Sequence, residues 1–257
     1  MTTSNPIANP DGNSKRLYTE PTRRILLMSE PRTGSTLLAG LLSQVGAGDA
    51  TEEMFHPEAC LEHHLTARNA LSYLRKIALQ RATPEGYFSC KIHFQQFAAL
   101  FETSEYHGHE FLNYFQSFII TRRRDHIAQA ISEYFAMKSG HWNSKSENLN
   151  KDQSAYIYDK SDLEPMTQIL NRQIIEENGW LHIINTLKIN TLHVYYEDLI
   201  LHPTSVMRTI TNHLNMDMAD APLVFPFRKI SNPTAVDNFK IAYLNDLNGV
   251  AINNNSS

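Results

Sequence analysis

One stretch near the start of the chain constrains the fold more than any other. The apolar run Ile25-Leu26-Leu27-Met28 leads directly into the loop Ser29-Glu30-Pro31-Arg32-Thr33-Gly34-Ser35-Thr36, and residues 34–42 carry leucines at helical spacing. The run predicts a buried strand and the spacing predicts a helix. In α/β proteins such a loop binds anions, because backbone N–H groups and the helix N-terminus face it. An ordinary capped helix start is the alternative interpretation of the same loop.

The alternation of strands and helices continues along the chain. Further strands are predicted at residues 87–92, 115–121 and 191–196, and further helices at residues 125–137, 166–187 and 204–214. Strands separated by helices indicate the α/β fold class, with a P-loop-type parallel sheet flanked by helices on both faces.

The chain is expected to form one domain. No linker rich in Pro or Gly divides the middle. Residues 23–248 are therefore predicted as a single domain between a flexible N-terminal arm, residues 1–22, and a flexible tail, residues 249–257. Residues 141–165 are rich in Ser, Asn, Asp and Lys, which is typical of a loop or lid over a site.

The charge balance excludes several classes of partner. Lys plus Arg is 23 and Asp plus Glu is 27, which gives a net charge of −4. A mildly acidic chain is not a general binder of nucleic acids or anionic membranes, so any anion must be held by a local basic pocket. Two cysteines, Cys60 and Cys90, are too few for a disulfide framework or a thiolate zinc site, and the first twenty residues lack an apolar signal segment. We expect a cytoplasmic protein with no metal and with neither a membrane nor a nucleic acid as partner.

The anion-binding loop departs from the Walker A motif of kinases and GTPases. If Gly34 takes the place of the second glycine, Ser29 stands at the first glycine and Ser35 at the lysine, and only Thr36 matches. The lysine that normally contacts the β- and γ-phosphates is missing, which argues against a Mg²⁺-ATP kinase.

The loop also resembles a motif of a different family. Pro31-Arg32-Thr33-Gly34-Ser35-Thr36 after a strand resembles the 5′-phosphosulfate loop of sulfotransferases that use 3′-phosphoadenylyl sulfate (PAPS). Arg32, where lysine is more frequent, and the following Leu37-Leu38 resemble the trehalose 2-sulfotransferase-like branch. The resemblance implies the sulfotransferase fold and a donor bound by these six loop residues.

A second basic element follows the predicted third strand. Arg122, Arg123 and Arg124 lie where a strand ends, and three adjacent guanidinium groups repel one another unless an anion lies there. A solvated basic turn is the alternative interpretation. Ser132 follows Arg124 by 132 − 124 = 8 positions. This spacing resembles the sulfotransferase motif that binds the 3′-phosphate of the donor.

Two further matches concern the nucleotide. Tyr196, at the end of the last predicted strand, resembles the tyrosine that lies near the adenine in this family, with a strand-end tyrosine of no binding role as the alternative. Arg228 and Lys229 resemble the Arg-Lys pair that closes over the 3′-phosphate, although Ile230 stands where that motif has glycine. A solvated basic pair on a surface loop is the alternative for these two residues.

Two residues compete for the role of the base that takes the proton of the acceptor. Glu53 precedes Met54-Phe55, and this segment resembles the one that carries the glutamate base in the trehalose-sulfotransferase branch. Lys91-Ile92-His93 resembles the Lys-x-His of cytosolic sulfotransferases, whose histidine is the base. The alternative interpretations are that Glu53 is a surface carboxylate and that His93 is a histidine that lines a pocket or lies in the core. Glu53 is preferred because the surrounding motifs match the first branch better, while Arg32 and Lys91 are expected to stabilise charge on the leaving oxygen.

Together these motifs imply an enzyme that moves a sulfuryl group from PAPS to a hydroxyl or amine of a small polar acceptor, leaving adenosine 3′,5′-bisphosphate. The resemblance suggests a sugar such as trehalose, or a secondary metabolite such as a saxitoxin-type alkaloid, as the acceptor, and it suggests a homodimer. Two alternatives stay open: a P-loop small-molecule kinase, and a noncatalytic nucleotide-binding protein of the same fold.

Overall fold

A sheet of four parallel strands lies at the centre of the computed structural model, which describes residues 20–140, 142, 157–218, 222–224 and 233–254. The strands are β1 (Arg23–Ser29), β2 (Tyr87–His93), β3 (Ser117–Arg122) and β4 (Thr191–Tyr195), in the order β2-β1-β3-β4. β2 is buried along its whole length and β1 along most of it. Burial on both faces explains why the inner strand β1 has an apolar run rather than an alternating pattern.

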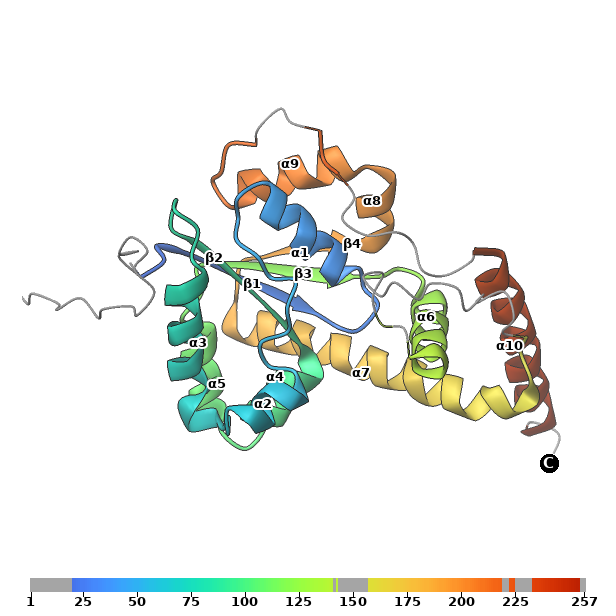
Figure 1. The fold of residues 1–257 in the computed structure, drawn as a ribbon. Coiled ribbons are helices and arrows are strands. Elements are labelled where there is room, and N and C mark those ends of the chain that lie inside the picture. The colour runs from blue at the N-terminus through green and yellow to red at the C-terminus, as the bar shows by residue number, and fades with distance from the viewer. Residues whose placement is uncertain (1–19, 141, 143–156, 219–221, 225–232, 255–257) are drawn as a thin grey trace, which may run out of the picture.

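Helices cover both faces of this sheet (Figure 1). On one face lie α1 (Ser35–Gln44), α8 (Tyr196–Leu201) and α9 (Pro203–His213), and on the other lie α2 (Pro57–Glu62), α3 (Ala67–Arg81), α4 (Phe94–Phe101), α5 (Glu105–Leu112) and α7 (Leu163–Leu187). At the carboxyl end of the sheet, α6 (His126–Ser139) and α10 (Pro233–Asn254) stand beside the long α7, which the short helix η2 (Lys160–Asp162) precedes. The predicted α/β class, with a parallel sheet and helices on both faces, is confirmed.

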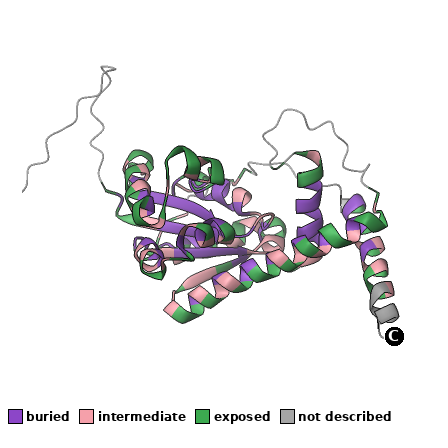
Figure 2. Cartoon of the chain, turned by 90° about the horizontal axis from the view of Figure 1, so that it is seen from below, coloured by how far each residue is buried: buried purple, intermediate pink, exposed green. Residues whose placement is uncertain are grey.

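Alternate side chains of β1 enter two separate cores. Leu26 and Met28 join a cluster with α3, α4, α5 and α7, whereas Ile25 and Leu27 join a cluster with α1, α8 and α9. Figure 2 shows the strands as a buried band between helices that are exposed on their outer sides. The strand that leads into the anion-binding loop is therefore packed from both faces.

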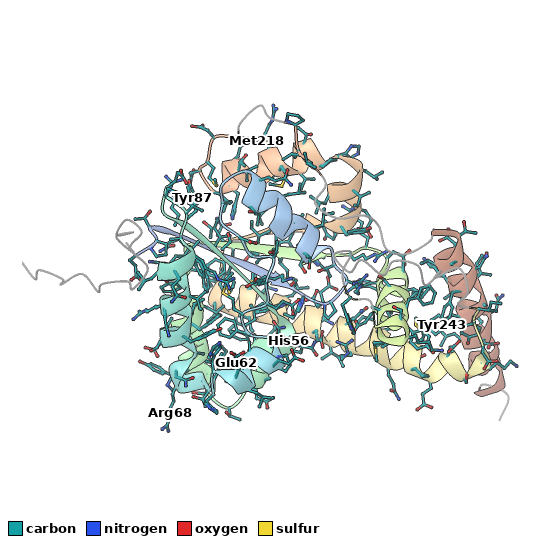
Figure 3. All side chains as sticks on the ribbon, in the orientation of Figure 1. His56, Glu62, Arg68, Tyr87, Met218 and Tyr243 are labelled. Atoms are coloured by element: carbon teal, nitrogen blue, oxygen red, sulfur yellow. The ribbon has the colours of Figure 1, made fainter. Side chains whose placement is uncertain are left out.

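A third core joins α6, α7 and α10. Tyr243 of α10, labelled in Figure 3, is fully buried there, and its hydroxyl lies 3.0 Å from Thr167 Oγ1 of α7. α10 extends to Asn254, so it includes residues 249–254 of the predicted tail.

The predicted strands and helices are all present, with small shifts at their ends. Helices α2, α3, α4, α5, α8 and α10 were not predicted, and α7 begins three residues earlier than expected, at Leu163 rather than Met166. Residues 1–19 of the expected arm, and residue 141 and residues 143–156 of the expected lid, lie outside the described residues. Among the residues that are described, no helix combines the length and the apolarity needed to cross a membrane.

The segment between α1 and α2 lies directly on β2. The Ser89 hydroxyl donates a hydrogen bond of 2.6 Å to the Ala47 carbonyl, and Gly48 adopts a φ angle of +96° against the strand. A Cβ atom on Gly48 would lie 2.9 Å from the backbone nitrogen of Ser89, so only glycine fits there. Met54 then enters the core beneath the sheet. These contacts fix the path of the chain through Glu53.

Replacing Gly48 by alanine should destabilise the fold by about 2–4 kcal/mol, because strain at positive φ and overlap with β2 act together. Gly46→Ala is the matched control. Gly46 also has a positive φ angle, of +80°, but a Cβ there meets no atom within 4 Å. Strain alone should then cost about 1–2 kcal/mol. Chemical denaturation measures both losses, and equal losses would contradict the close approach of Gly48 to β2.

Candidate active site

Residues 30–34 connect β1 to α1 at the carboxyl edge of the sheet. Arg32 and Gly34 have positive φ angles of 65° and 83°, and Gly34 is the N-cap residue of α1. The Thr33 hydroxyl donates to the Glu30 carbonyl at 2.9 Å and lies 2.8 Å from Thr121 Oγ1 of β3. These two contacts hold the loop against β3. No side chain among the described residues caps the first turn of α1. The first N–H groups of α1 are therefore free of a side-chain cap, as binding of an anion at a helix start requires.

Arg32 joins the loop to α6. Its Nε donates to Ser132 Oγ at 3.0 Å, and its Nη1 donates to the Trp142 carbonyl at 2.6 Å. The Gln129 side chain of α6 donates to the Pro31 carbonyl at 2.9 Å. The loop and Ser132, which resemble two separate phosphate-binding motifs in the sequence, therefore lie side by side.

Arg123 and Tyr196 complete this side of the site. The Arg123 guanidinium carbon lies 4.7 Å from the centroid of the Tyr196 ring, and that ring packs against the loop, since a Cβ on Gly34 would lie 2.7 Å from it. Burial lowers the pKa of Arg123, and burial followed by the charge of Arg123 lowers the pKa of Arg32. Arg123 Nε is buried without a hydrogen-bond partner among the described residues. Two neighbouring guanidinium groups that are partly buried are suited to bind an anion.

The three consecutive arginines diverge instead of gathering at one point. Arg122 binds Glu177 of α7 at 2.5 Å. Arg124 is half-exposed and makes a bidentate pair with Asp198 of α8, at 2.8 and 2.7 Å. The structure therefore brings Arg123, and not Arg124, toward Arg32. Successive side chains at a strand end point in different directions, which a spacing of eight positions does not reveal.

The two rival candidates for the base lie in one hydrogen-bonded group. His93 Nε2 lies 3.1 Å from Glu53 Oε1, and His93 Nδ1 lies 2.9 Å from Ser29 Oγ. Lys91 Nζ lies 3.3 Å from the same Glu53 oxygen and donates to Thr36 Oγ1 of α1 at 3.1 Å. Sequence comparison presents Glu53 and His93 as alternatives, but in the folded chain they are in contact.

Glu53 is the member of this group that solvent reaches. Its side chain is 29% exposed, against 8% for His93 and 1% for Lys91. Burial acts to raise the pKa of the Glu53 carboxyl, but His93, Lys91 and a hydrogen bond from Gln96 outweigh it and hold that pKa well below its usual range. Burial in turn lowers the pKa of Lys91, although the Glu53 charge opposes this. Glu53 is therefore ionised at neutral pH and accessible to a substrate.

Ser35, Arg228 and Lys229 are further site residues that the sequence predicts. Ser35 is buried at the start of α1, and Arg228 and Lys229 lie outside the described residues. Arg123 was predicted only as one of three adjacent arginines, and Gln96 was not predicted. For Arg123 the run of three arginines was the available signal, whereas no local pattern marks Gln96. Within the described part of the chain, no group of three or more His, Cys, Asp or Glu side chains is placed to hold a metal ion.

The chain is similar to proteins of one enzyme class. The sequence profile described as Stf0 sulphotransferase matches residues 25–240. The sulfotransferase of Alicyclobacillus acidocaldarius is 12% identical, over 87% of this chain and 92% of that chain, with a TM-score of 0.50. A sulfotransferase of Mycobacterium avium is 14% identical, over 90% of this chain and 69% of that chain, with a TM-score of 0.48. At such identities solved structures bear on the fold alone, and no curated protein sequence matches the chain.

Glu53→Gln should destabilise the protein at neutral pH by about 2–4 kcal/mol, because the buried Lys91 ammonium loses its anionic partner. The pKa of Glu53 lies below its ordinary value of 4.5 in the folded state. Its contribution is therefore present above that pH and is lost as the pH falls, so the difference from wild type should shrink in acid.

Glu52→Gln is the matched neighbour. Glu52 pairs with Arg81 at 2.6 Å, but its side chain is 68% exposed, so the loss should stay below about 1 kcal/mol. Denaturation of both variants at several pH values measures the effect. A Glu53→Gln loss as small as that of Glu52→Gln, or one independent of pH, would contradict the role assigned to this ion pair.

Proposed function

The chain belongs to the Stf0 sulfotransferase family, and from this premise we propose that it transfers a sulfuryl group from PAPS to a hydroxyl or amine of a small polar acceptor. The observation that carries the proposal is the hydrogen bond of 3.0 Å between Arg32 and Ser132. It joins the element expected to bind the 5′-phosphosulfate to the element expected to bind the 3′-phosphate, although the two residues are 100 positions apart. A bisphosphate nucleotide is the ligand that such a pair of adjacent anion sites suits.

The residues of the loop would bind the reacting end of the donor. The uncapped N–H groups at the start of α1 and the Arg32 guanidinium would donate hydrogen bonds to it. Ser132 and Arg123 would contact the 3′-phosphate, and the Tyr196 ring offers an apolar face for the adenine. Arg124 would join them only after releasing Asp198.

The reaction requires positioning, charge stabilisation and one proton transfer. The sulfur–oxygen bond to the 5′-phosphate breaks as the acceptor oxygen or nitrogen forms a bond to the same sulfur, and negative charge develops on the phosphate oxygen that leaves. Arg32 and the loop N–H groups would stabilise that charge, and Lys91 would act through the Thr36 hydroxyl, which lies 3.1 Å from its ammonium nitrogen. Glu53, ionised and accessible, would accept the proton of the acceptor, while His93 holds its orientation.

Two acceptor classes follow from the family resemblance. One is a sugar such as trehalose, and the other is a secondary metabolite such as a saxitoxin-type alkaloid. Incubation of the protein with PAPS and both kinds of acceptor, with release of adenosine 3′,5′-bisphosphate as the readout, tests the proposal. Turnover with an acceptor of either class supports the proposal. Donor binding without turnover would favour a noncatalytic nucleotide-binding protein, and Mg²⁺-dependent turnover of ATP would favour a kinase.

Arg123→Ala should weaken binding of adenosine 3′,5′-bisphosphate by about tenfold or more, because one charge-assisted contact to a phosphate is lost. Arg124→Ala is the adjacent control and should change the affinity by less than about threefold, because Arg124 is paired with Asp198. Titration calorimetry measures both affinities. A larger loss of affinity in Arg124→Ala than in Arg123→Ala would instead assign binding of the 3′-phosphate to Arg124, as its spacing to Ser132 suggests.

Glu53→Gln should lower kcat by about 10²- to 10⁴-fold and leave the affinity for adenosine 3′,5′-bisphosphate within about threefold of wild type. The physical reason is that the amide keeps the shape of the side chain but cannot accept the proton. His93→Gln is the comparison, and a smaller loss is expected because Glu53 remains. A full loss of turnover in His93→Gln together with an active Glu53→Gln would reverse the assignment of the base.

A further inference from the structure

Glu30 is a buried carboxyl in the anion-binding loop for which the proposed mechanism has no role. The residue is 1% exposed, and its Oε1 atom has no hydrogen-bond partner among the described residues. An ionised carboxylate that is buried and incompletely bonded is costly, so such a group is either paired with a cation or kept neutral.

The groups that face Glu30 do not supply that cation. They are Glu176 and Glu177 from α7 and Arg122 from β3. Arg122 already binds Glu177 at 2.5 Å, so its charge is largely balanced. Burial, followed by the charges of Glu177 and Glu176, raises the pKa of Glu30 to about 9.

Glu133 is a further carboxyl group, and Arg172 links it to Glu176. Arg172 binds Glu176 at 2.9 Å and also pairs with Glu133. His126 lies 3.7 Å from Glu177 and is partly exposed. The cluster as a whole holds four carboxyl groups and two guanidinium groups, namely Glu30, Glu133, Glu176 and Glu177 with Arg122 and Arg172. This excess of carboxyls in a buried place is relieved when a proton stays on one of them. Glu30 is the one without a cation of its own.

We propose that Glu30 is a positioning residue of the loop, held as a neutral carboxylic acid by its burial and by the α7 carboxylates, and that this neutral form is required for the loop to bind an anion. The inference rests on the proposed function, because the anion in question is the phosphate end of the donor. The Glu30 carbonyl already anchors the loop through Thr33. Because Glu30 is itself a residue of the loop, an ionised side chain there would add a negative charge to the element proposed to bind the phosphate. The two negative charges would repel each other.

Ionisation of Glu30 and anion binding therefore oppose each other. Raising the pH removes the proton and weakens binding of the phosphate, and binding of the phosphate makes the proton harder to remove. Glu30→Gln keeps the shape of the neutral acid but cannot ionise, so it separates the charge of this residue from its packing.

Binding of adenosine 3′,5′-bisphosphate between about pH 7 and pH 9.5, measured by calorimetry, tests the inference. Wild type should lose on the order of tenfold in affinity across this range, and Glu30→Gln should lose much less. Lys91, whose pKa burial lowers, is present in both proteins and affects both profiles alike. Glu85→Gln is the control, because Glu85 is exposed near the amino end of β2, and it should follow wild type.

Infrared difference spectra give a readout that needs no nucleotide. Wild type at neutral pH should show the C=O stretch of a neutral carboxylic acid, and Glu30→Gln should lack that band. Absence of the band in wild type, or equal pH profiles for wild type and Glu30→Gln, would overturn the inference and leave the proposed donor standing. Failure of wild type to bind the nucleotide at any pH would instead overturn the proposed donor and the binding half of the inference, while the band would still report the neutral carboxyl.

Discussion

The rest of the site depends on the ion pair that the buried ammonium group of Lys91 makes with Glu53. Lys91 comes from β2, is 1% exposed, and reaches Glu53 at 3.3 Å and Thr36 at 3.1 Å. A buried cation must keep an anionic partner, so the segment that carries Glu53 cannot leave the sheet without a large loss of stability. One charge thus connects the strand β2, the start of α1 and the candidate base.

A second arrangement of charge lies on the other side of the same loop. Arg32 and Arg123 are partly desolvated and have little compensation, whereas the carboxyls behind Glu30 outnumber their cations. In the proposed mechanism an added anion stabilises the Arg32 and Arg123 pair, and the cluster around Glu30 retains a proton. Both conditions follow from burial, because in water neither set of charges would need a partner.

Much of the fold could be predicted from the sequence because its signals are local. The apolar runs of the strands and the composition of residues 29–36 are visible without tertiary contacts. The missed helices lacked such signals: α4 begins at Phe94 directly after the last residue of β2, with no turn between them. The contact between Glu53 and His93 could not be predicted either, because it depends on the packing of Gly48 against β2. The orientation of the Arg124 side chain depends on its pairing with Asp198, which lies 74 positions away in the sequence, so the residues around Arg124 do not reveal it.

The central claim is that the loop and the start of α6 form one site for a bisphosphate nucleotide. A crystal structure of the protein with adenosine 3′,5′-bisphosphate tests it most directly. The 5′-phosphate should lie on the N–H groups of residues 33–36, the 3′-phosphate should contact Ser132 and Arg123, and the adenine should lie beside Tyr196. A nucleotide bound away from residues 31–36, or a protein that does not bind it at saturating concentration, would contradict the account.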